Sequence, residues 1–132
     1  MGRYLILSSS RPGQLPANLQ GVWAEEVHTM WNGDYHFNIN TQMNYWLTMP
    51  CNLIEMNEPM INFIDARVEP GTKTAKAYYN TRGWIAHRLT NVWGYTSPAG
   101  MDIGGAAWLC EHLWEQYAFT MDKDFLKKVY PI

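Results

Sequence analysis

Two long stretches of this chain carry apolar residues at the three- and four-residue spacing of an amphipathic helix. The spacing predicts that each helix packs one face against other elements. The first stretch starts after or is interrupted at Pro59, and its apolar residues are Leu53, Met56, Met60, Phe63, Ile64 and Val68. The second runs from Gly104 or Gly105 to about Thr120, with Ala106, Cys110, Leu113, Tyr117 and Met121 on one face and Trp108, Leu109 and Trp114 beside it.

Shorter patterns predict further helices between loops. Thr41 to Met49 contains no helix breaker before Pro50, and Asp122 is placed to cap a last helix through Tyr130. Pro70-Gly71 is expected to end the first long helix, with a separate short helix over residues 72–79. Residues 8–20 and 84–100 are rich in turn-forming residues. A chain of 132 residues has the length of one domain, and these patterns predict an all-α fold with functional residues on the loops.

One short segment places polar and apolar residues in strict alternation. His36, Asn38 and Asn40 alternate with Tyr35, Phe37 and Ile39. In an extended backbone successive side chains point to opposite faces, so the imidazole and the two amides would share one face. They could form the polar wall of a pocket, or equally the solvent-exposed face of an ordinary edge strand.

The composition around this row favours the pocket wall. The chain holds seven Trp and eight Tyr, and no charged residue lies between His36 and Trp46. Aromatic rings stack on the C–H faces of sugars, and amides both donate to and accept from hydroxyl groups. The segment is therefore typical of a carbohydrate-binding site.

Other classes of function find little support. The net charge of −2 offers no basic surface for nucleic acid or an anionic membrane, and no apolar run is long enough to cross a bilayer. His112 and Glu115 lack the second histidine of a zinc-binding helix, so we expect no metal there and interpret them as a solvated flank of the helix. The sequence contains no Gly-rich phosphate loop, no Gly-x-Ser-x-Gly nucleophile elbow and no Cys-x-x-Cys motif, and we expect no cofactor.

Several motifs together resemble one family, the catalytic domain of glycoside hydrolase family 95. The resemblance covers nearly the whole chain, and several motifs in the family's order are more specific than any one alone. The motifs are Arg3-Tyr4-Leu5-Ile6-Leu7-Ser8-Ser9-Ser10-Arg11-Pro12-Gly13, Leu15-Pro16-Ala17-Asn18-Leu19-Gln20-Gly21-Val22-Trp23, residues 36–46, Gly83-Trp84-Ile85-Ala86-His87, Asn91-Val92-Trp93-Gly94 and residues 105–117.

The resemblance implies a fold and an activity. Members of this family are inverting exo-α-L-fucosidases that mainly cleave α1,2-linked fucose, with some α-L-galactosidases. Their catalytic domain is an (α/α)6 barrel preceded by a β-sandwich domain. Residues 1–132 would be the N-terminal portion of such a barrel, incomplete, with the remainder of the barrel as packing partner and a fucosylated glycan as substrate.

The resemblance also implies roles for individual residues. By motif match, Asn38 and Asn40 would be the catalytic amides that position the attacking water, with a carboxylate polarising them. His36 would contact the sugar, and Trp108 is a candidate for stacking on it. The family's general acid lies in a downstream Ser-Pro-Glu motif and the supporting Asp lies further on, and neither motif occurs here.

We therefore expect the chain to be a piece of a longer enzyme and to turn over poorly alone. The chain stops partway through the amphipathic pattern that includes Tyr130, which also indicates a piece of a longer chain. The alternatives are a non-catalytic sugar-binding relic of the same fold, an α-L-galactosidase, or a different (α/α)6 enzyme such as a phosphorylase. A purely structural helical protein would not need His36, Asn38 and Asn40 in register.

Overall fold

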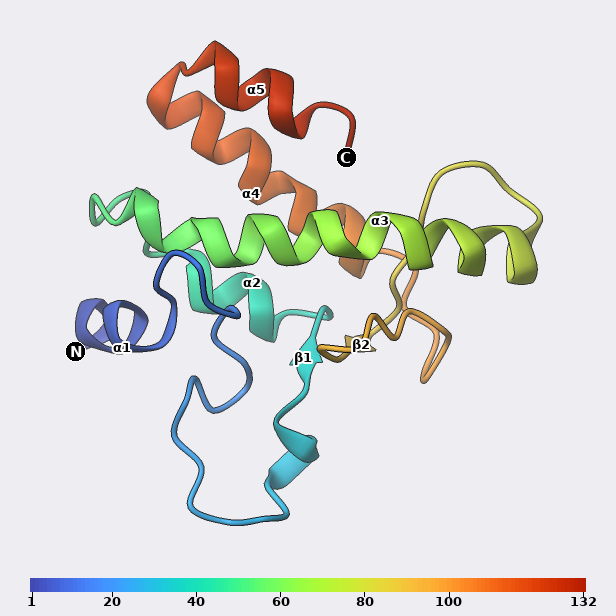
Figure 1. Cartoon of the computed structure of the whole chain (residues 1–132), viewed down its shortest axis with the longest axis horizontal. Coiled ribbons are helices and arrows are strands. Elements are labelled where there is room, and N and C mark those ends of the chain that lie inside the picture. The colour runs from blue at the N-terminus through green and yellow to red at the C-terminus, as the bar shows by residue number, and fades with distance from the viewer.

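The computed structural model describes all residues from Met1 to Ile132 and is mostly helical (Figure 1). In chain order its elements are α1 (Gly2–Ser9), the 3-10 helix η1 (Met30–Gly33), β1 (Tyr35–His36), α2 (Asn40–Tyr45), the 3-10 helix η2 (Ile54–Asn57), α3 (Glu58–Tyr79), β2 (Leu89–Thr90), α4 (Gly105–Thr120) and α5 (Lys123–Val129). Each strand has only two residues, so the predicted all-α class is confirmed at the level of secondary structure.

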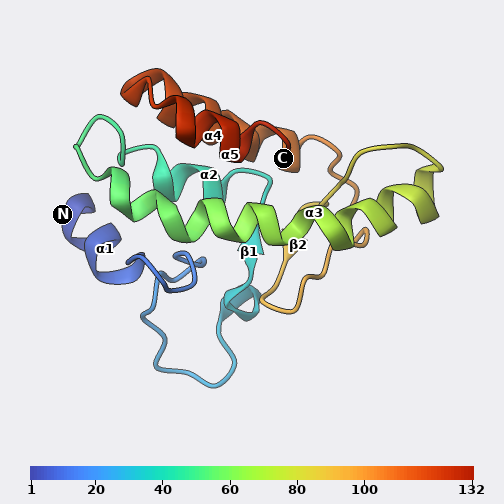
Figure 2. The same cartoon turned by 45° about the horizontal axis from the view of Figure 1, so that its top comes forward.

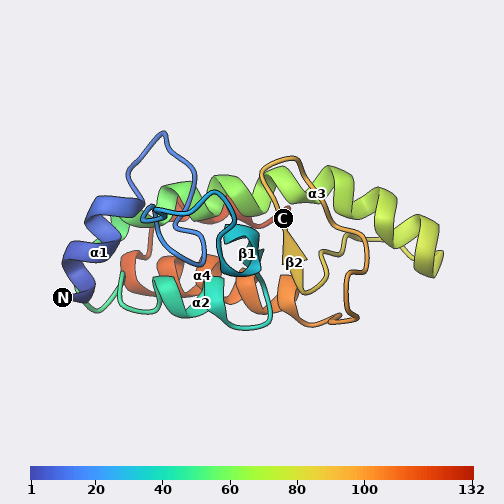
Figure 3. The ribbon, with the colours of Figure 1, turned by 90° about the horizontal axis from the view of Figure 1, so that it is seen from below.

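Helix α3 runs along the long axis of the molecule, and the other elements lie on its two sides. Helices α4 and α5 form a hairpin on one side, while the two strands and the loop of residues 10–34 lie on the other (Figure 2). Seen from below, α2 and α4 run beside each other (Figure 3), and these two helices are in contact. The strands β1 and β2 pair antiparallel, with Tyr35 opposite Thr90 and His36 opposite Leu89.

A single hydrophobic core joins these elements. Its buried members come from α1, β1, α2, η2, α3, α4, α5 and the loops between them. They are Ile6, Ala17, Tyr35, Phe37, Tyr45, Leu53, Met56, Met60, Ile61, Phe63, Ile64, Ala86, Ala106, Leu109, Leu113 and Val129. Helix α3 contributes its Met60–Ile61 and Phe63–Ile64 pairs, which follow the predicted helical spacing.

The expected break at Pro70-Gly71 is wrong, because α3 continues through both residues to Tyr79. The loop after α3 folds back onto this point. An ideal Cβ on Gly71 would lie 2.7 Å from the carbonyl oxygen of Ile85, so only glycine allows the loop to approach. The backbone N–H of Ile85 also donates to the carbonyl oxygen of Gly71 at 3.2 Å. Gly71 therefore serves the packing of residues 84–86 rather than a helix end.

The extended row over residues 35–40 is shorter than expected. Only Tyr35 and His36 are in a strand, residues 37–39 turn, and α2 begins at Asn40. Helix α2 also ends at Tyr45 rather than Met49. The Thr48 hydroxyl donates to the carbonyl oxygen of Tyr45 at 2.7 Å, and tight turns replace the helix after that point.

The two C-terminal helices are confirmed. Helix α4 spans Gly105–Thr120, as the apolar spacing predicts. The carboxylate of Asp122 accepts from the backbone N–H groups of Asp124 and Phe125 at 2.9 and 3.1 Å, and so caps α5.

Candidate functional site

The three polar residues of the alternating row line one hollow of about 270 Å³. His36, Asn38 and Asn40 share it with Leu19, Trp31 and Arg88. His36 is buried, whereas Asn38 and Asn40 are exposed. Ile39 is also partly exposed, so the apolar side of the row is less uniform than its sequence suggests. The turn after His36 still brings both amides to the same hollow as the imidazole.

The paired strands fix the first part of this wall. Beyond the pairing of His36 with Leu89, the backbone N–H of Phe37 donates to the carbonyl oxygen of Arg88 at 2.6 Å. The Phe37 side chain is fully buried and meets the Phe63 ring edge-on, with centroids 6.4 Å apart. Phe37 therefore anchors the backbone between His36 and Asn38 in the core.

The turn that carries Asn38 is fixed from the other side by Gln42 and α4. The side-chain amide of Gln42 donates to the carbonyl oxygen of Phe37 at 2.6 Å and to that of Gly105 at 3.3 Å. Gln42 is completely buried, so these bonds are shielded from water. One amide side chain thus couples the start of α2, the turn and the start of α4.

Burial governs the charge state of His36. Burial lowers the pKa of His36 below its ordinary value, Asp34 opposes this shift, and the charge of Arg88 adds to it. The Trp31 ring meets the imidazole edge-on, with centroids 5.8 Å apart. At neutral pH the hollow therefore presents a neutral imidazole that can both donate and accept a hydrogen bond.

Sequence reasoning missed Arg88 as a lining residue of this hollow. It reaches the hollow because β2 pairs with β1, a contact over fifty residues that no local pattern reveals. A signal was present, however. Arg88 is the one Lys, Arg, Asp or Glu between Arg82 and Asp102, in a loop otherwise built of aromatic, small and uncharged polar residues.

Trp108 lies in a different hollow from the two asparagines. Its hollow, of about 490 Å³, is formed by the end of α2 and one face of α4, and its lining residues are Trp46, Trp108, Glu111, His112, Trp114, Glu115 and Ala118. The structure thus brings His36, Asn38 and Asn40 together and leaves Trp108 apart from them.

The interpretation of His112 as part of a solvated helix flank is wrong. His112 is only 5% exposed, because α4 turns this side chain inward beside Leu109 and Leu113. Its Nδ1 lies 3.9 Å from a carboxylate oxygen of Glu115, which is too long for a hydrogen bond. Burial lowers the pKa of His112.

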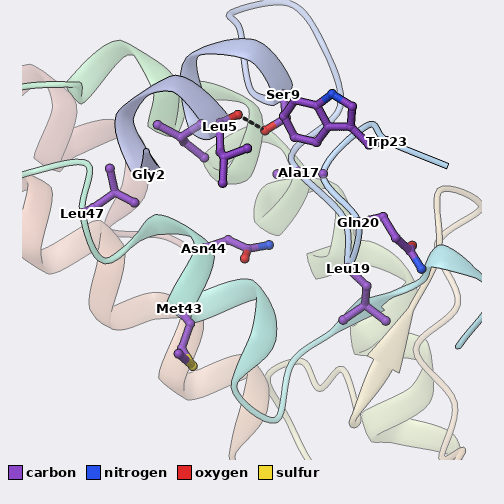
Figure 4. Close-up of a pocket in the computed structure, with 12 residues that line it drawn as sticks. Gly2, Leu5, Ser9, Ala17, Leu19, Gln20, Trp23, Met43, Asn44 and Leu47 are labelled. Atoms are coloured by element: carbon purple, nitrogen blue, oxygen red, sulfur yellow. Dashed lines mark hydrogen bonds between the residues drawn. The ribbon is translucent and has the colours of Figure 1, made fainter. Parts of the chain in front are cut away.

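A third hollow, of about 420 Å³, opens between α1, the loop of residues 17–23 and α2 (Figure 4). Leu5 points into it from α1, Met43 from α2 and Leu47 from the turn after α2, and the Trp23 ring lies beside Ser9 at its rim. More than half of its lining residues are apolar, and the polar ones are Ser9, Gln20 and Asn44.

Two further kinds of site, for a metal ion and for a membrane, were sought in the structure. No three His, Cys, Asp or Glu side chains lie close enough together to hold a metal ion. None of the helices combines the length and apolar character needed to span a bilayer.

Comparison with known families matches the whole chain. The family model described as the glycosyl hydrolase family 95 catalytic domain matches residues 1–132. The chain belongs to this family. The family resemblance drawn from the motifs is therefore confirmed.

Similar family 95 proteins carry names of fucosidases. The chain is 48% identical to "Alpha-L-fucosidase 2" of Arabidopsis thaliana over 139 aligned positions, which cover 99% of the chain and 16% of that protein. It is 40% identical to "Probable alpha-fucosidase A" of Aspergillus niger, over 99% of the chain and 18% of that protein. A protein of the same name from Aspergillus oryzae is 38% identical over 87% of the chain. The chain thus spans less than a fifth of the length of these relatives.

Proposed function

We propose that this chain is the N-terminal part of a family 95 catalytic domain, and that the longer protein hydrolyses terminal α-L-fucosides with inversion. Three observations support this proposal. The family 95 match covers residues 1–132, similar proteins are named as fucosidases, and one hollow gathers His36, Asn38 and Asn40. The last observation carries the proposal, because it joins the residues that the chemistry requires.

Inverting hydrolysis needs an acid that protonates the leaving oxygen and a base that activates water on the opposite face of the sugar. An amide is no base by itself. Its carbonyl oxygen can accept a hydrogen bond from the attacking water, and this acceptor is stronger when the amide NH2 donates to a carboxylate. We assign this role to Asn38 and Asn40, with His36 binding a sugar hydroxyl.

The acid must come from outside this hollow. Its six lining residues include no Asp or Glu. We propose that the general acid and the carboxylate behind the amides are supplied by other parts of the longer protein. Removal of a general acid typically lowers the rate about 10²- to 10⁴-fold, so the chain alone should release little fucose.

We propose that Trp108 stacks on the same substrate. Because Trp108 lines a different hollow from Asn38 and Asn40, the substrate would have to extend past the start of α4 to reach it. The support is its partly buried ring near the N-terminus of α4 and its aromatic neighbours Trp46 and Trp114. A Trp108→Phe variant of the longer protein should keep most activity, and Trp108→Ala should raise KM. An unchanged KM in Trp108→Ala would remove this residue from the site.

We further propose that the remainder of an (α/α)6 barrel packs on the faces that this chain leaves open. The family resemblance implies a barrel of paired helices, and α4 and α5 form one such pair. Exposed apolar side chains occur on α2, directly after it and on α4, namely Met43, Trp46, Trp114 and Phe119, and the lining of the hollow in Figure 4 is mainly apolar. Sedimentation of the isolated chain should therefore reveal self-association that increases with concentration. A monodisperse monomer that melts cooperatively would contradict this proposal.

The central experiment measures fucose release from 2′-fucosyllactose by the longer protein and by the chain alone. Asn38→Ala and Asn40→Ala should each lower kcat strongly while sugar binding persists. Asn44→Ala, whose side chain lines the separate hollow of Figure 4, is the matched control. Near-normal turnover in Asn40→Ala would refute the water-positioning role. Binding without release in the longer protein would instead indicate a sugar-binding relic. A preference for α-L-galactosides would identify the galactosidase alternative.

A further inference from the structure

Arg88 places a positive charge at the hollow that holds the two asparagines. Its side chain is exposed and lines that hollow beside His36, Asn38 and Asn40. Neither of the two Lys–carboxylate ion pairs involves it, since these join Lys73 to Glu69 and Lys127 to Asp124. The guanidinium is therefore free to meet a ligand.

The guanidinium lies directly against the backbone of Gly100. An ideal Cβ on Gly100 would lie 2.9 Å from Cζ of Arg88 and 3.1 Å from one of its terminal nitrogens. Gly100 also has a φ of +86°, a conformation that residues with a side chain rarely adopt. Glycine at this position leaves the space that the guanidinium occupies, so the direction of the Arg88 side chain is constrained.

The loop that carries Arg88 is anchored by buried hydrogen bonds on both sides of it. His87 is fully buried, and its Nδ1–H donates to the carbonyl oxygen of Thr96 at 2.7 Å, while its Nε2 lies 2.7 Å from the Tyr79 hydroxyl. On the other side, Arg67 donates to the Thr90 hydroxyl at 3.0 Å. Binding a ligand to a group held on such a support costs little ordering entropy.

No carboxylate lines this hollow, and its only ionisable lining residues are His36 and Arg88. The carboxylate of Asp34 acts on His36 from outside the lining. Two amides and an imidazole already provide donors and acceptors for the hydroxyl groups of a neutral sugar. A guanidinium only donates, and its planar fork matches the paired oxygens of a carboxylate or a sulfate.

We propose that Arg88 binds an anionic group on the glycan, so that this site selects acidic oligosaccharides that carry a carboxylate or a sulfate ester. This inference rests on the proposed function only in treating the hollow as a glycan site. It adds a specificity-determining residue that the sequence motifs do not single out.

The test is a titration of the chain, kept below the concentration at which it self-associates, with sugars that differ only in the group at C6 and contain no fucose. Methyl β-D-glucuronide is compared with methyl β-D-glucoside, which has an uncharged CH2OH in place of the carboxylate, and with methyl β-D-glucoside 6-sulfate. Binding is followed by NMR through the Trp31 indole N–H and the Arg88 Nε–H. We expect an anionic probe to bind about five- to tenfold more tightly than the neutral one at low salt, with the preference shrinking as salt is added.

Matched variants decide the role of Arg88. Arg88→Gln should abolish the preference for the anion and Arg88→Lys should keep part of it. Arg82→Gln, which removes an exposed arginine at the start of the same loop and outside the hollow, should leave it unchanged. Equal affinities for charged and neutral probes, no saturable binding, or a preference that survives Arg88→Gln would overturn the proposal. The anionic probe that binds more tightly identifies the source as a uronic acid or a sulfate ester.

The two proposals can fail separately. Loss of the charge preference with intact fucose release would remove the role of Arg88 and leave the hydrolase. An Arg88-dependent preference for anionic sugars without fucose release would keep the role of Arg88 and remove the hydrolase. The two results can be separated because the probes contain no fucose.

Discussion

Gly105, the first residue of α4, lies against the backbone of Phe37, the residue between His36 and Asn38. An ideal Cβ on Gly105 would lie 2.6 Å from the carbonyl oxygen of Phe37 and 2.9 Å from its Cβ. The side-chain amide of Gln42 bonds to the carbonyl oxygens of both residues. The position of Asn38 therefore depends on the absence of a side chain on α4.

Gly105→Ala should push the Phe37 backbone away and displace Asn38. Because the obstructing atom is backbone, we expect a loss of about 1–3 kcal/mol in the free energy of unfolding, together with weaker sugar binding at the hollow. Urea denaturation followed by Trp fluorescence measures the first effect. Gly104→Ala is the matched control, since the nearest atom to its Cβ is a carboxylate oxygen of Asp102 at 3.7 Å. Equal stability of the two variants would contradict the close packing described here.

Arg67 links α3 to the loop behind the hollow without a carboxylate partner. Its guanidinium lies 3.7 Å above the centre of the Phe63 ring, Nε donates to the Thr90 hydroxyl, and one terminal nitrogen donates to the carbonyl oxygen of Asn91 at 2.7 Å. Arg67 is only 3% exposed, and burial lowers its pKa. Its hydrogen bonds therefore compensate for the cost of burying a charge.

Arg67→Met should keep much of the apolar packing but remove both donors that tie α3 to the loop, so that the Asn91 carbonyl oxygen keeps only its longer bond from the Gly94 N–H, at 3.3 Å. We expect a loss of about 2 kcal/mol in the free energy of unfolding and faster hydrogen exchange at Leu89 and Thr90. Lys73→Met, on an exposed face of the same helix, should change stability by less than about 0.5 kcal/mol, because its pair with Glu69 is exposed. If Arg67→Met were as mild as Lys73→Met, Arg67 would not anchor the loop.

The sequence pattern within each segment correctly predicted α4 and the start of α5. The bounds of α4 follow from its apolar spacing, and the start of α5 follows from Asp122. The predicted helix end at Pro70-Gly71 was wrong, because Gly71 can either end a helix or leave space for another segment to pack against the helix. The approach of Ile85 decides between these outcomes, and Ile85 lies fourteen positions further along the chain.

The candidate site was predictable only in part, because some of its residues come together through contacts between distant segments. The spacing of His36, Asn38 and Asn40 placed them on one wall, although a turn rather than a long strand brings them together. Arg88 joins them only through the pairing of two strands of two residues each, which are too short to leave a periodic signal. The burial of His112 depends on which side of α4 meets the core, and the mixed apolar pattern of that helix did not decide this.

Asp122 offers a local test of the α4–α5 hairpin. Asp122→Ala removes the acceptor for two backbone N–H groups at the start of α5, so we expect a loss of about 1 kcal/mol in the free energy of unfolding. Asp122→Asn should recover most of it. Asp124→Ala, which removes only an exposed pair with Lys127, should cost a few tenths of a kcal/mol. A cost for Asp124→Ala that matched that of Asp122→Ala would assign the effect to helix charge rather than to the cap.

Buried His112 should make the stability of the chain depend on pH. Burial lowers its pKa in the folded state, so between the folded pKa and the ordinary value near 6.5 the unfolded chain binds more protons. Its contribution to stability is therefore fully present above about pH 6.5 and is lost as the pH falls through the folded pKa. His36 shifts in the same direction and adds to the effect.

Denaturant titrations at a series of pH values from about 7.5 to 5 measure this dependence. The free energy of unfolding should fall with pH, and the slope should be smaller in His112→Gln, which cannot take up a proton in this range. His36→Gln should reduce the slope as well, and the two effects should add because the residues lie in separate hollows. An unchanged slope in His112→Gln would show that Glu115, 3.9 Å away, balances the effect of burial by favouring the charged imidazole.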